Sequence, residues 1–270
     1  MDRIRQGLTA AVVLATACGL AAGPAAATPE DTAVCTPTGA HPVPVVLLHG
    51  TMDDATAWST LAPQLTAAGY CVFAPTYGVA GAVPGLGGVA PVSRSAVEIS
   101  DFLDRVLAAT GSDRVDIVGH SQGGTIAEYL AKNMRQAARI RSAIMLAPVS
   151  HGTTLSGAVG AADTVPGLRG LVDTAVLPVF CAACADLETG SAFIAALDAG
   201  PIAQPGVRYA VLATRDDAVA TPAGPASFIE EPGVTNHYVQ ELAPVAVSHK
   251  DLPRDAVAGR WVREQLDAAA

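Results

Sequence analysis

Short runs of apolar residues recur along the chain, separated by longer segments that are apolar at only some positions. The runs consist mainly of Val, Leu, Ile and Ala, which is typical of strands buried on both faces of a parallel sheet. They lie at 43–48, 71–74, 115–118, 140–146, 207–213 and 238–242. Because parallel strands need long crossovers, which are usually helical, this alternation predicts an α/β fold with helices on both faces of a mostly parallel sheet.

The segments between these runs carry helix signals. Apolar residues three and four positions apart predict a helix that ends before Gly69. Ser95 and Glu98 have the spacing of a capping box, so we expect a long helix to begin at Ser95. Two further helices are expected at 125–134 and 255–268.

One long segment, residues 150–206, interrupts the alternation of strands and helices. It mixes short apolar stretches with Gly, Pro and a Cys-x-x-Cys pair. We interpret it as an excursion above the sheet that borders the mouth of the functional site, not as a second domain. Residues 28–270 are therefore expected to form a single domain.

The beginning of the chain has the features of a secretion signal. Arg3 and Arg5 precede an apolar run at 8–20, and the Ala-Ala-Ala at 25–27 fits a cleavage site. We therefore expect the first 27 residues to be removed and the chain to be secreted, because no later segment has eighteen uninterrupted apolar residues. Cys18 allows an alternative, a lipid-anchored protein, but its upstream residues lack the usual Leu.

Composition and charge narrow the class of protein. Half of the residues are hydrophobic and 15% are charged, which favours one folded domain with a large core and excludes a disordered chain. The net charge is −9, and it becomes −10 once the leader, with two Arg and one Asp, is removed. This acidic balance argues against nucleic acid or an anionic membrane as the main partner.

Four cysteines remain after the leader, and an even number in an exported chain favours disulfides. Three pairings are possible. We favour Cys35–Cys71 and Cys181–Cys184, because the first would tie the N-terminus to a strand and contribute about 3–4 kcal/mol. The Cys-x-x-Cys pair could instead be half of a zinc site or a redox motif, but the sequence context that either needs is not visible.

The segment 119–123, Gly-His-Ser-Gln-Gly, matches the G-x-S-x-G pattern of a nucleophile elbow. It lies between the strand expected at 115–118 and the helix expected at 125–134, which is the context that such an elbow requires. Small neighbours let the serine occupy a sharp turn with its hydroxyl exposed. We therefore expect Ser121 to be a nucleophile; the alternative is an ordinary Gly-rich turn with a surface serine.

A serine nucleophile needs donors for the oxyanion that forms on its substrate. The His-Gly-Thr that follows the first strand and the residue after the serine occupy the usual positions, so we assign the N–H groups of Thr51 and Gln122. His49 is interpreted as a structural residue that holds this loop. Asp53 and Asp54 are interpreted as solvated carboxylates, not metal ligands.

The serine also needs a base, and the base needs an acid, in the chain order Ser, Asp or Glu, His. The strand expected at 207–213 leads into Asp216 and Asp217, and Asp217 is preferred because a tight connection follows it. The alternative is that both are ordinary turn carboxylates.

Only two of the six histidines, His237 and His249, follow the expected acid. His237 would lie at the start of the strand at 238–242, which is the wrong end of a parallel sheet. His249 lies after that strand and before the last helix, where a loop could bring its imidazole to Ser121. We therefore expect His249 to be the base.

Several segments together resemble one known family. They are His-Pro-Val-Pro-Val-Val-Leu-Leu-His-Gly-Thr at 41–51, Gly-Tyr-Cys-Val-Phe-Ala at 69–74, Gly-His-Ser-Gln-Gly-Gly at 119–124, the Cys-x-x-Cys pair, and Asp217-x-x-x-Thr-Pro. In these the chain resembles the extracellular actinobacterial lipases of the class 2 lipase family. The resemblance implies an α/β-hydrolase fold and triacylglycerol lipase or esterase activity without a cofactor. It also implies that Asp217, not Asp216, is the acid.

The hypothesis from sequence is a secreted serine ester hydrolase that acts through an acyl-enzyme. Its expected partners are a lipid or another ester, with transient contact to lipid surfaces, and we expect a monomer. An esterase for short soluble acyl chains would use the same residues. So would an extracellular acyltransferase, with an alcohol in place of water. A binding protein without activity is the least favoured alternative, because every member of the triad has a candidate.

Overall fold

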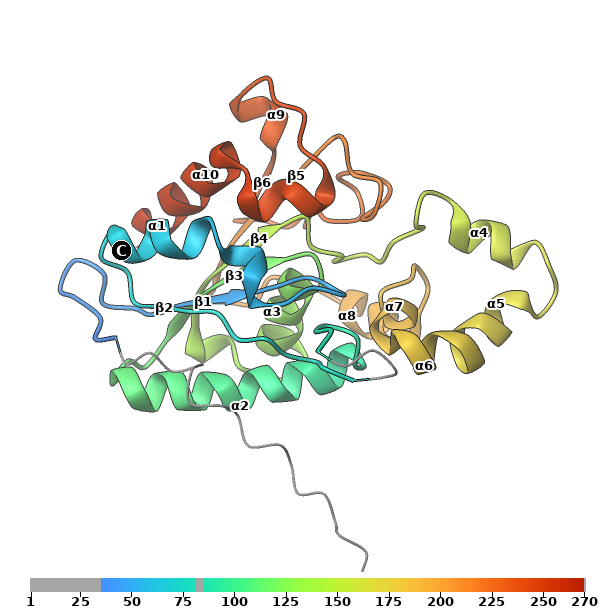
Figure 1. The fold of residues 1–270 in the computed structure, drawn as a ribbon, viewed down its shortest axis with the longest axis horizontal. Coiled ribbons are helices and arrows are strands. Elements are labelled where there is room, and N and C mark those ends of the chain that lie inside the picture. The colour runs from blue at the N-terminus through green and yellow to red at the C-terminus, as the bar shows by residue number, and fades with distance from the viewer. Residues whose placement is uncertain (1–34, 81–84, 270) are drawn as a thin grey trace, which may run out of the picture.

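The computed structural model describes residues 35–80 and 85–269, and its centre is a six-stranded parallel sheet (Figure 1). The strand order is β2-β1-β3-β4-β5-β6. The strands are β1 (Val45–Leu48), β2 (Val72–Phe73), β3 (Val115–His120), β4 (Ile140–Leu146), β5 (Arg208–Ala213) and β6 (Thr235–Tyr238). The order reverses at β1, so the chain first builds one edge of the sheet and then crosses to build the other.

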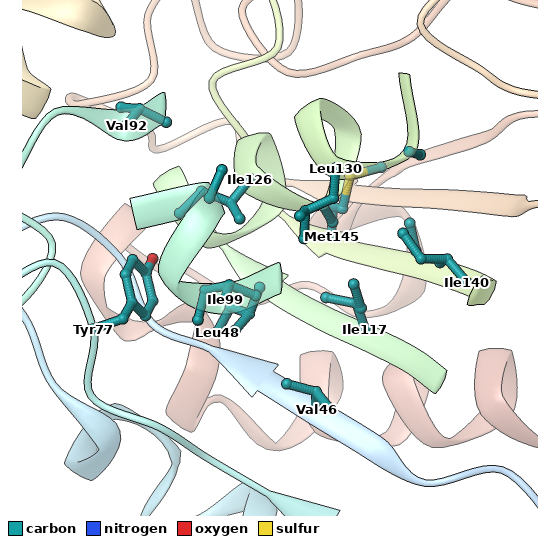
Figure 2. Close-up of a cluster of buried hydrophobic side chains, with 14 of the residues drawn as sticks. Val46, Leu48, Tyr77, Val92, Ile99, Ile117, Ile126, Leu130, Ile140 and Met145 are labelled. Atoms are coloured by element: carbon teal, nitrogen blue, oxygen red, sulfur yellow. The ribbon is translucent and has the colours of Figure 1, made fainter. Parts of the chain in front are cut away.

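Helices cover both faces of this sheet (Figure 1). One face carries α2 (Val92–Thr110) and α3 (Gln122–Lys132), and the other carries α1 (Leu61–Ala67) and α10 (Ala256–Asp267). Successive residues of a strand point to opposite faces. In β1, Val46 and Leu48 therefore pack beneath α2 and α3 (Figure 2), while Val45 and Leu47 pack against α1 and α10. The predicted α/β architecture is confirmed.

The long helix α2 begins earlier than the capping-box prediction places it. Its first residue is Val92, after Pro91, and Ser95 lies inside the helix with its N–H donating to the Pro91 carbonyl at 3.0 Å. The predicted capping box is wrong. Asp186 instead accepts the Val92 N–H at 2.8 Å, so a residue far along the chain satisfies the first turn.

The predicted last strand, 238–242, is also misplaced. The strand β6 ends at Tyr238, and 239–242 form the short helix α9 (Val239–Leu242). The Glu241 side chain turns back to accept the Tyr238 N–H at 3.3 Å, which stabilises the start of this helix. His237 consequently lies near the carboxyl end of a strand, not at its start.

Short helices make up most of the excursion at 150–206. They are α4 (Ala158–Asp163), α5 (Leu168–Leu171), the π-helix η4 (Val172–Val176), α6 (Leu177–Phe180), α7 (Ala182–Asp186) and α8 (Ala192–Asp198). No residue of α5, η4 or α6 is buried. In Figure 1 the helices α4 to α6 extend away from one end of the sheet. The 3₁₀ helices elsewhere among the described residues are η2 (Ala55–Trp58), η3 (Ala137–Arg139) and η5 (His249–Arg254).

The structure contains both disulfides that the sequence predicts. Cys35 is bonded to Cys71, which attaches the start of the described chain to the region of β2, and Cys181 is bonded to Cys184 across the start of α7. The predicted leader and Cys18 lie outside the described residues. Of the helices that the structure describes, none is long and apolar enough to cross a membrane.

Candidate active site

Ser121 occupies the sharp turn between β3 and α3. Its backbone has φ 52° and ψ −124°, a conformation that L-residues rarely adopt and that costs about 1–3 kcal/mol. Two hydrogen bonds hold this turn: the Ser121 N–H donates to the Leu146 carbonyl, and the Ser121 carbonyl accepts the Gly124 N–H, both at 2.9 Å. The side chain of Ser121 opens into a cavity.

The glycines on either side of Ser121 are required by the closeness of the surrounding backbone. A Cβ on Gly119 would lie 2.4 Å from the carbonyl carbon of Gly123. A Cβ on Gly123 would lie 2.2 Å from the carbonyl oxygen of Leu48, at the end of β1. The helix α3 therefore starts so close to β1 and β3 that no side chain fits at either position. This contact gives the G-x-S-x-G pattern its physical cause.

His249 and Asp217 form a buried pair. The Nδ1 of His249 lies 2.7 Å from Oδ2 of Asp217, and the two side chains are only 7% and 1% exposed. The other oxygen of Asp217 accepts the N–H groups of Val219 and Ala220 at 2.8 and 2.7 Å. Because the carboxylate is an acceptor, Nδ1 of His249 carries a proton and Nε2 is left as the basic nitrogen.

The alternative acid and base make different contacts. Asp216 is exposed and accepts from the Gln240 side chain at 3.2 Å and from the Val247 N–H at 3.3 Å. His237 is partly buried, and its Nδ1 lies 3.4 Å from Glu241. Neither residue lines the cavity into which Ser121 opens, whereas His249 does. The structure thus brings Ser121, Asp217 and His249 together and leaves these two outside.

The two expected oxyanion donors lie side by side. The Thr51 hydroxyl donates to Oε1 of Gln122 at 2.8 Å, which joins the loop after β1 to the first residue of α3. Within the described part of the chain, neither the Thr51 N–H nor the Gln122 N–H donates to another protein group. A helix N-terminus adds a partial positive charge at this point. The pair is suited to hold a negatively charged oxygen.

His49 supports the loop that carries Thr51. Its ring stacks on Tyr77 with 4.2 Å between centroids. The Tyr77 N–H donates to Nε2 at 3.2 Å, so Nδ1 carries the proton that is donated to the Gly50 carbonyl at 2.8 Å. Burial lowers the pKa of His49 from its ordinary value, which keeps the ring neutral. These contacts agree with the structural role expected for His49.

Sequence reasoning missed one residue near the site. His120 precedes the serine, so the chain order of a triad excludes it as the base. Its Nε2 nevertheless lies 2.9 Å from the carbonyl oxygen of His249, and its ring lines the same cavity. No sequence signal points to this contact, because 129 positions separate the two residues.

The cavity has a volume of about 300 Å³ and opens to solvent. The excursion supplies part of its wall through Thr153, Leu155, Cys184 and Leu187. The wall is mostly apolar, with Met52, Val149 and Val219 among its other residues. In the described ranges 35–80 and 85–269, no group of three His, Cys, Asp or Glu side chains could hold a metal ion.

This geometry can be compared with known proteins. A sequence model of the family described as Lipase (class 2) matches residues 42–227, which include the elbow and the Asp217 loop. The chain belongs to the class 2 lipase family. Membership makes it a carboxylic ester hydrolase whose substrate is a lipid or another ester. No curated protein matches the sequence.

Solved structures show the same fold at low sequence identity. Aspergillus fumigatus lipase B superposes with a TM-score of 0.64 and 17% identity over 83% of this chain and 52% of its own, so the chain spans about half of that lipase. A Bacillus licheniformis lipase in its mature form gives 0.61 and 16% over 86% and 95%. The enol-lactonase of Burkholderia xenovorans gives 0.53 and 19% over 86% and 94%. These likenesses identify the α/β-hydrolase fold.

Proposed function

We propose that this class 2 lipase is a secreted triacylglycerol lipase or carboxylesterase that uses Ser121, His249 and Asp217 as a catalytic triad. The observation that carries the proposal is the buried His249–Asp217 pair beside the cavity into which Ser121 opens. A serine on a strained elbow that lines the cavity, a base with a fixed tautomer and two unused N–H groups are the parts that acyl transfer needs.

In the proposed mechanism the Ser121 hydroxyl attacks the ester carbonyl while Nε2 of His249 takes its proton. The negative charge that develops on the carbonyl oxygen is held by the N–H groups of Thr51 and Gln122. Asp217 stabilises the imidazolium that forms, because its carboxylate already accepts from Nδ1. His249 then protonates the leaving alcohol, and a water activated by the same nitrogen releases the acid.

The cavity wall supports an ester with an apolar acyl group. A space of about 300 Å³ lies at the lower end of the range for small-molecule sites, and its wall is mostly apolar. An extracellular acyltransferase remains the second candidate, because an alcohol could replace water in the second step. Product analysis with added glycerol separates the two: a hydrolase releases free acid, and a transferase forms a new ester.

The excursion supports contact with a lipid surface. Its apolar patch consists of Val165, Leu168, Leu171, Val176, Val179 and Phe180, all of them exposed. The excursion lines the cavity on both sides of the patch, with Leu155 before the patch and Cys184 after it. Arg169 is paired with Asp163, Asp173 and Glu188, so the charge around the patch is not basic. An uncharged lipid surface therefore fits better than an anionic one.

Secretion and a monomeric state belong to the same proposal. Two disulfides support an oxidising compartment such as the cell exterior. The expected leader would direct the chain there. Mass spectrometry of protein from the culture medium tests secretion and removal of the leader: a mature chain that begins at Thr28 is expected.

The test of the triad is the variant Ser121→Ala. Hydrolysis of p-nitrophenyl butyrate should fall by at least about 10⁴-fold, because the nucleophile is lost. The unfolding temperature should change little. Ser59→Ala, at an exposed serine on the end of η2, is the matched control and should retain full activity. Substantial activity in Ser121→Ala would refute the proposed function.

A further inference from the structure

His120 links the nucleophile strand to the residue that carries the base. It is the last residue of β3, directly before Ser121, and only 4% of its surface is exposed. Its Nε2 lies 2.9 Å from the main-chain oxygen of His249, and the two imidazole rings lie 4.8 Å apart between centroids. One side chain therefore bridges the two segments whose relative position decides whether Ser121 and His249 can exchange a proton.

The position of the proton on His120 follows from this contact. A carbonyl oxygen only accepts, so Nε2 must carry the hydrogen that is donated. The Nδ1 atom is buried and has no hydrogen-bond partner among the described residues. It packs against Gly50, where a Cβ would lie 3.0 Å away. Burial, and then the charge of His249, lower the pKa of His120 well below its ordinary value, so the ring stays neutral.

His249 is the first residue of the 3₁₀ helix η5, and the chain that leads to it has little regular structure. The segment 243–248 between α9 and η5 contains no helix or strand. After β5, the Thr214 hydroxyl donates to the Val247 carbonyl at 2.6 Å and Asp216 accepts the Val247 N–H at 3.3 Å. The contact from His120 is made to the main chain of His249 itself. Asp217 orients the imidazole of His249, but it does not by itself fix the main chain from which that side chain extends.

We propose that His120 is a positioning residue for the triad: its Nε2–H holds the main chain of His249 so that the imidazole faces Ser121. The inference rests on the proposed function, since it concerns the same base. His120 acts through His249 and makes no contact with the reacting atoms. A ring that only filled space would need the same volume but no donor, and this difference can be tested.

Three substitutions separate the donor from the volume. Leucine removes the donor and keeps much of the bulk. Glutamine is similar in size to leucine and can place an amide N–H near the position of imidazole Nε2. Asparagine is polar but too short to reach the carbonyl of His249. His237→Leu, at a partly buried histidine outside the cavity, is the matched control.

The measurements are kcat and KM for p-nitrophenyl butyrate and the rate constant for inactivation by a fluorophosphonate, each per titrated active site. His120→Leu and His120→Asn should lower kcat and the inactivation rate by about 10- to 100-fold, the size expected for a misplaced base. KM should change by less than about threefold. His120→Gln should recover kcat to within about fivefold of the wild-type value, and His237→Leu should match the wild type.

The inference would be overturned if the glutamine and leucine variants lost the same fraction of kcat. It would also be overturned if the lower activity came only from a smaller number of titratable active sites. If the leucine variant does not fold, the comparison of asparagine with glutamine decides, and a folded but inactive His120→Gln refutes the proposal. Wild-type protein that does not react with the fluorophosphonate at Ser121 would refute the proposed function. Reactive wild type with variants that react equally fast would refute only the role of His120.

Discussion

The turn at Ser121 and the helices α4 to α6 are opposite kinds of structure within one chain. Around Ser121 the backbones of β1, β3 and α3 approach so closely that Gly119 and Gly123 admit no Cβ. In the excursion, an added Cβ on Gly160 or Gly170 would meet nothing within 4 Å. The first region holds its backbone atoms in tight contact, whereas the second leaves apolar side chains exposed to solvent.

This difference in packing fits the functions proposed for the two regions. Proton transfer and oxyanion binding need donors and acceptors held in place before the substrate arrives, so their residues lie on strand ends and in a tight turn. A segment that borders the entrance has no such requirement and buries little surface. Regions with few buried contacts open locally at low free-energy cost. We therefore expect substitutions in the turn to have large effects and equivalent substitutions in the excursion to have small ones.

Among the substitutions that test this difference, Asp217→Asn is expected to have the largest effect. The asparagine oxygen would keep the two N–H groups of Val219 and Ala220, so its NH₂ would face Nδ1 of His249. That nitrogen would then have to accept, which puts the proton on Nε2 and disables the base. We expect kcat to fall by about 10³- to 10⁴-fold. Asp163→Asn in the excursion and Asp216→Asn should each stay within about twofold in the same p-nitrophenyl ester assay.

The next effect concerns stability and compares two glycines. Gly123→Ala would place a methyl 2.2 Å from the Leu48 carbonyl, and neither backbone can move without breaking the sheet. It should lower the free energy of unfolding by at least about 3 kcal/mol. Gly170→Ala, in helix α5 with open space around it, should raise the free energy by up to about 1 kcal/mol. Urea unfolding measures both, and similar losses would contradict the contrast.

A buried acid behind the turn gives a pH-dependent prediction. Glu128 lies on α3 and is fully buried, and burial raises its pKa to about 8. The Ser150 hydroxyl lies 2.6 Å from Oε1 of Glu128 and 3.0 Å from the Ser227 carbonyl. One hydroxyl hydrogen cannot serve both oxygens. A protonated Glu128 that donates to Ser150, which in turn donates to Ser227, satisfies both contacts.

The sign of the effect follows from this raised pKa. Below about pH 4.5 the carboxyl is protonated in the folded and unfolded states, so its contribution to stability is complete. Between about 4.5 and 8 only the unfolded state loses the proton, and the free energy of unfolding should fall by a few kcal/mol. Glu128→Gln should remove this slope, as measured by urea unfolding at several pH values. A slope that persists in the variant would have another source.

The smallest effect is expected in the excursion. Leu171→Asp places a charge in the exposed apolar patch, and we expect it to lower activity on emulsified triacylglycerol by about tenfold, because a charge weakens contact with lipid. Hydrolysis of soluble p-nitrophenyl butyrate should not change. Leu242→Asp, at an exposed leucine of α9, is the matched control and should leave both activities intact. Equal effects of the two variants would show that the patch has no special role.

Much of the fold could be predicted because its strands carry a strong local signal. The runs at 115–118 and 140–146 are mostly apolar, as expected for a sheet covered on both faces. The strand β6 lacks this signal: its four residues, Thr-Asn-His-Tyr, are all only partly buried. The apolar Val239 and Leu242 that suggested a strand belong to α9 instead. An edge strand with one neighbour is stabilised by pairing with β5, which no local pattern reveals.

The candidate site could be predicted for a related reason, and its missed parts are those that depend on distant contacts. Close packing restricts positions 119 and 123, two residues before and after Ser121, to glycine, so the elbow can be recognised in the sequence. The start of α2 depends on Asp186, and the contact of His120 depends on His249, both far away along the chain. Glu128 resembles any polar residue of a helix, and only the fold shows that it is buried.

We infer that Ser121 is the nucleophile and that His249 activates it. The most direct measurement is peptide mapping by mass spectrometry after incubation with a fluorophosphonate, for the wild type and for His249→Ala. We predict a single adduct on the peptide that contains Ser121, formed at least about 10³-fold more slowly in the variant. An adduct on another residue would contradict this assignment. So would protein that carries no adduct at the end of the incubation and still hydrolyses the ester.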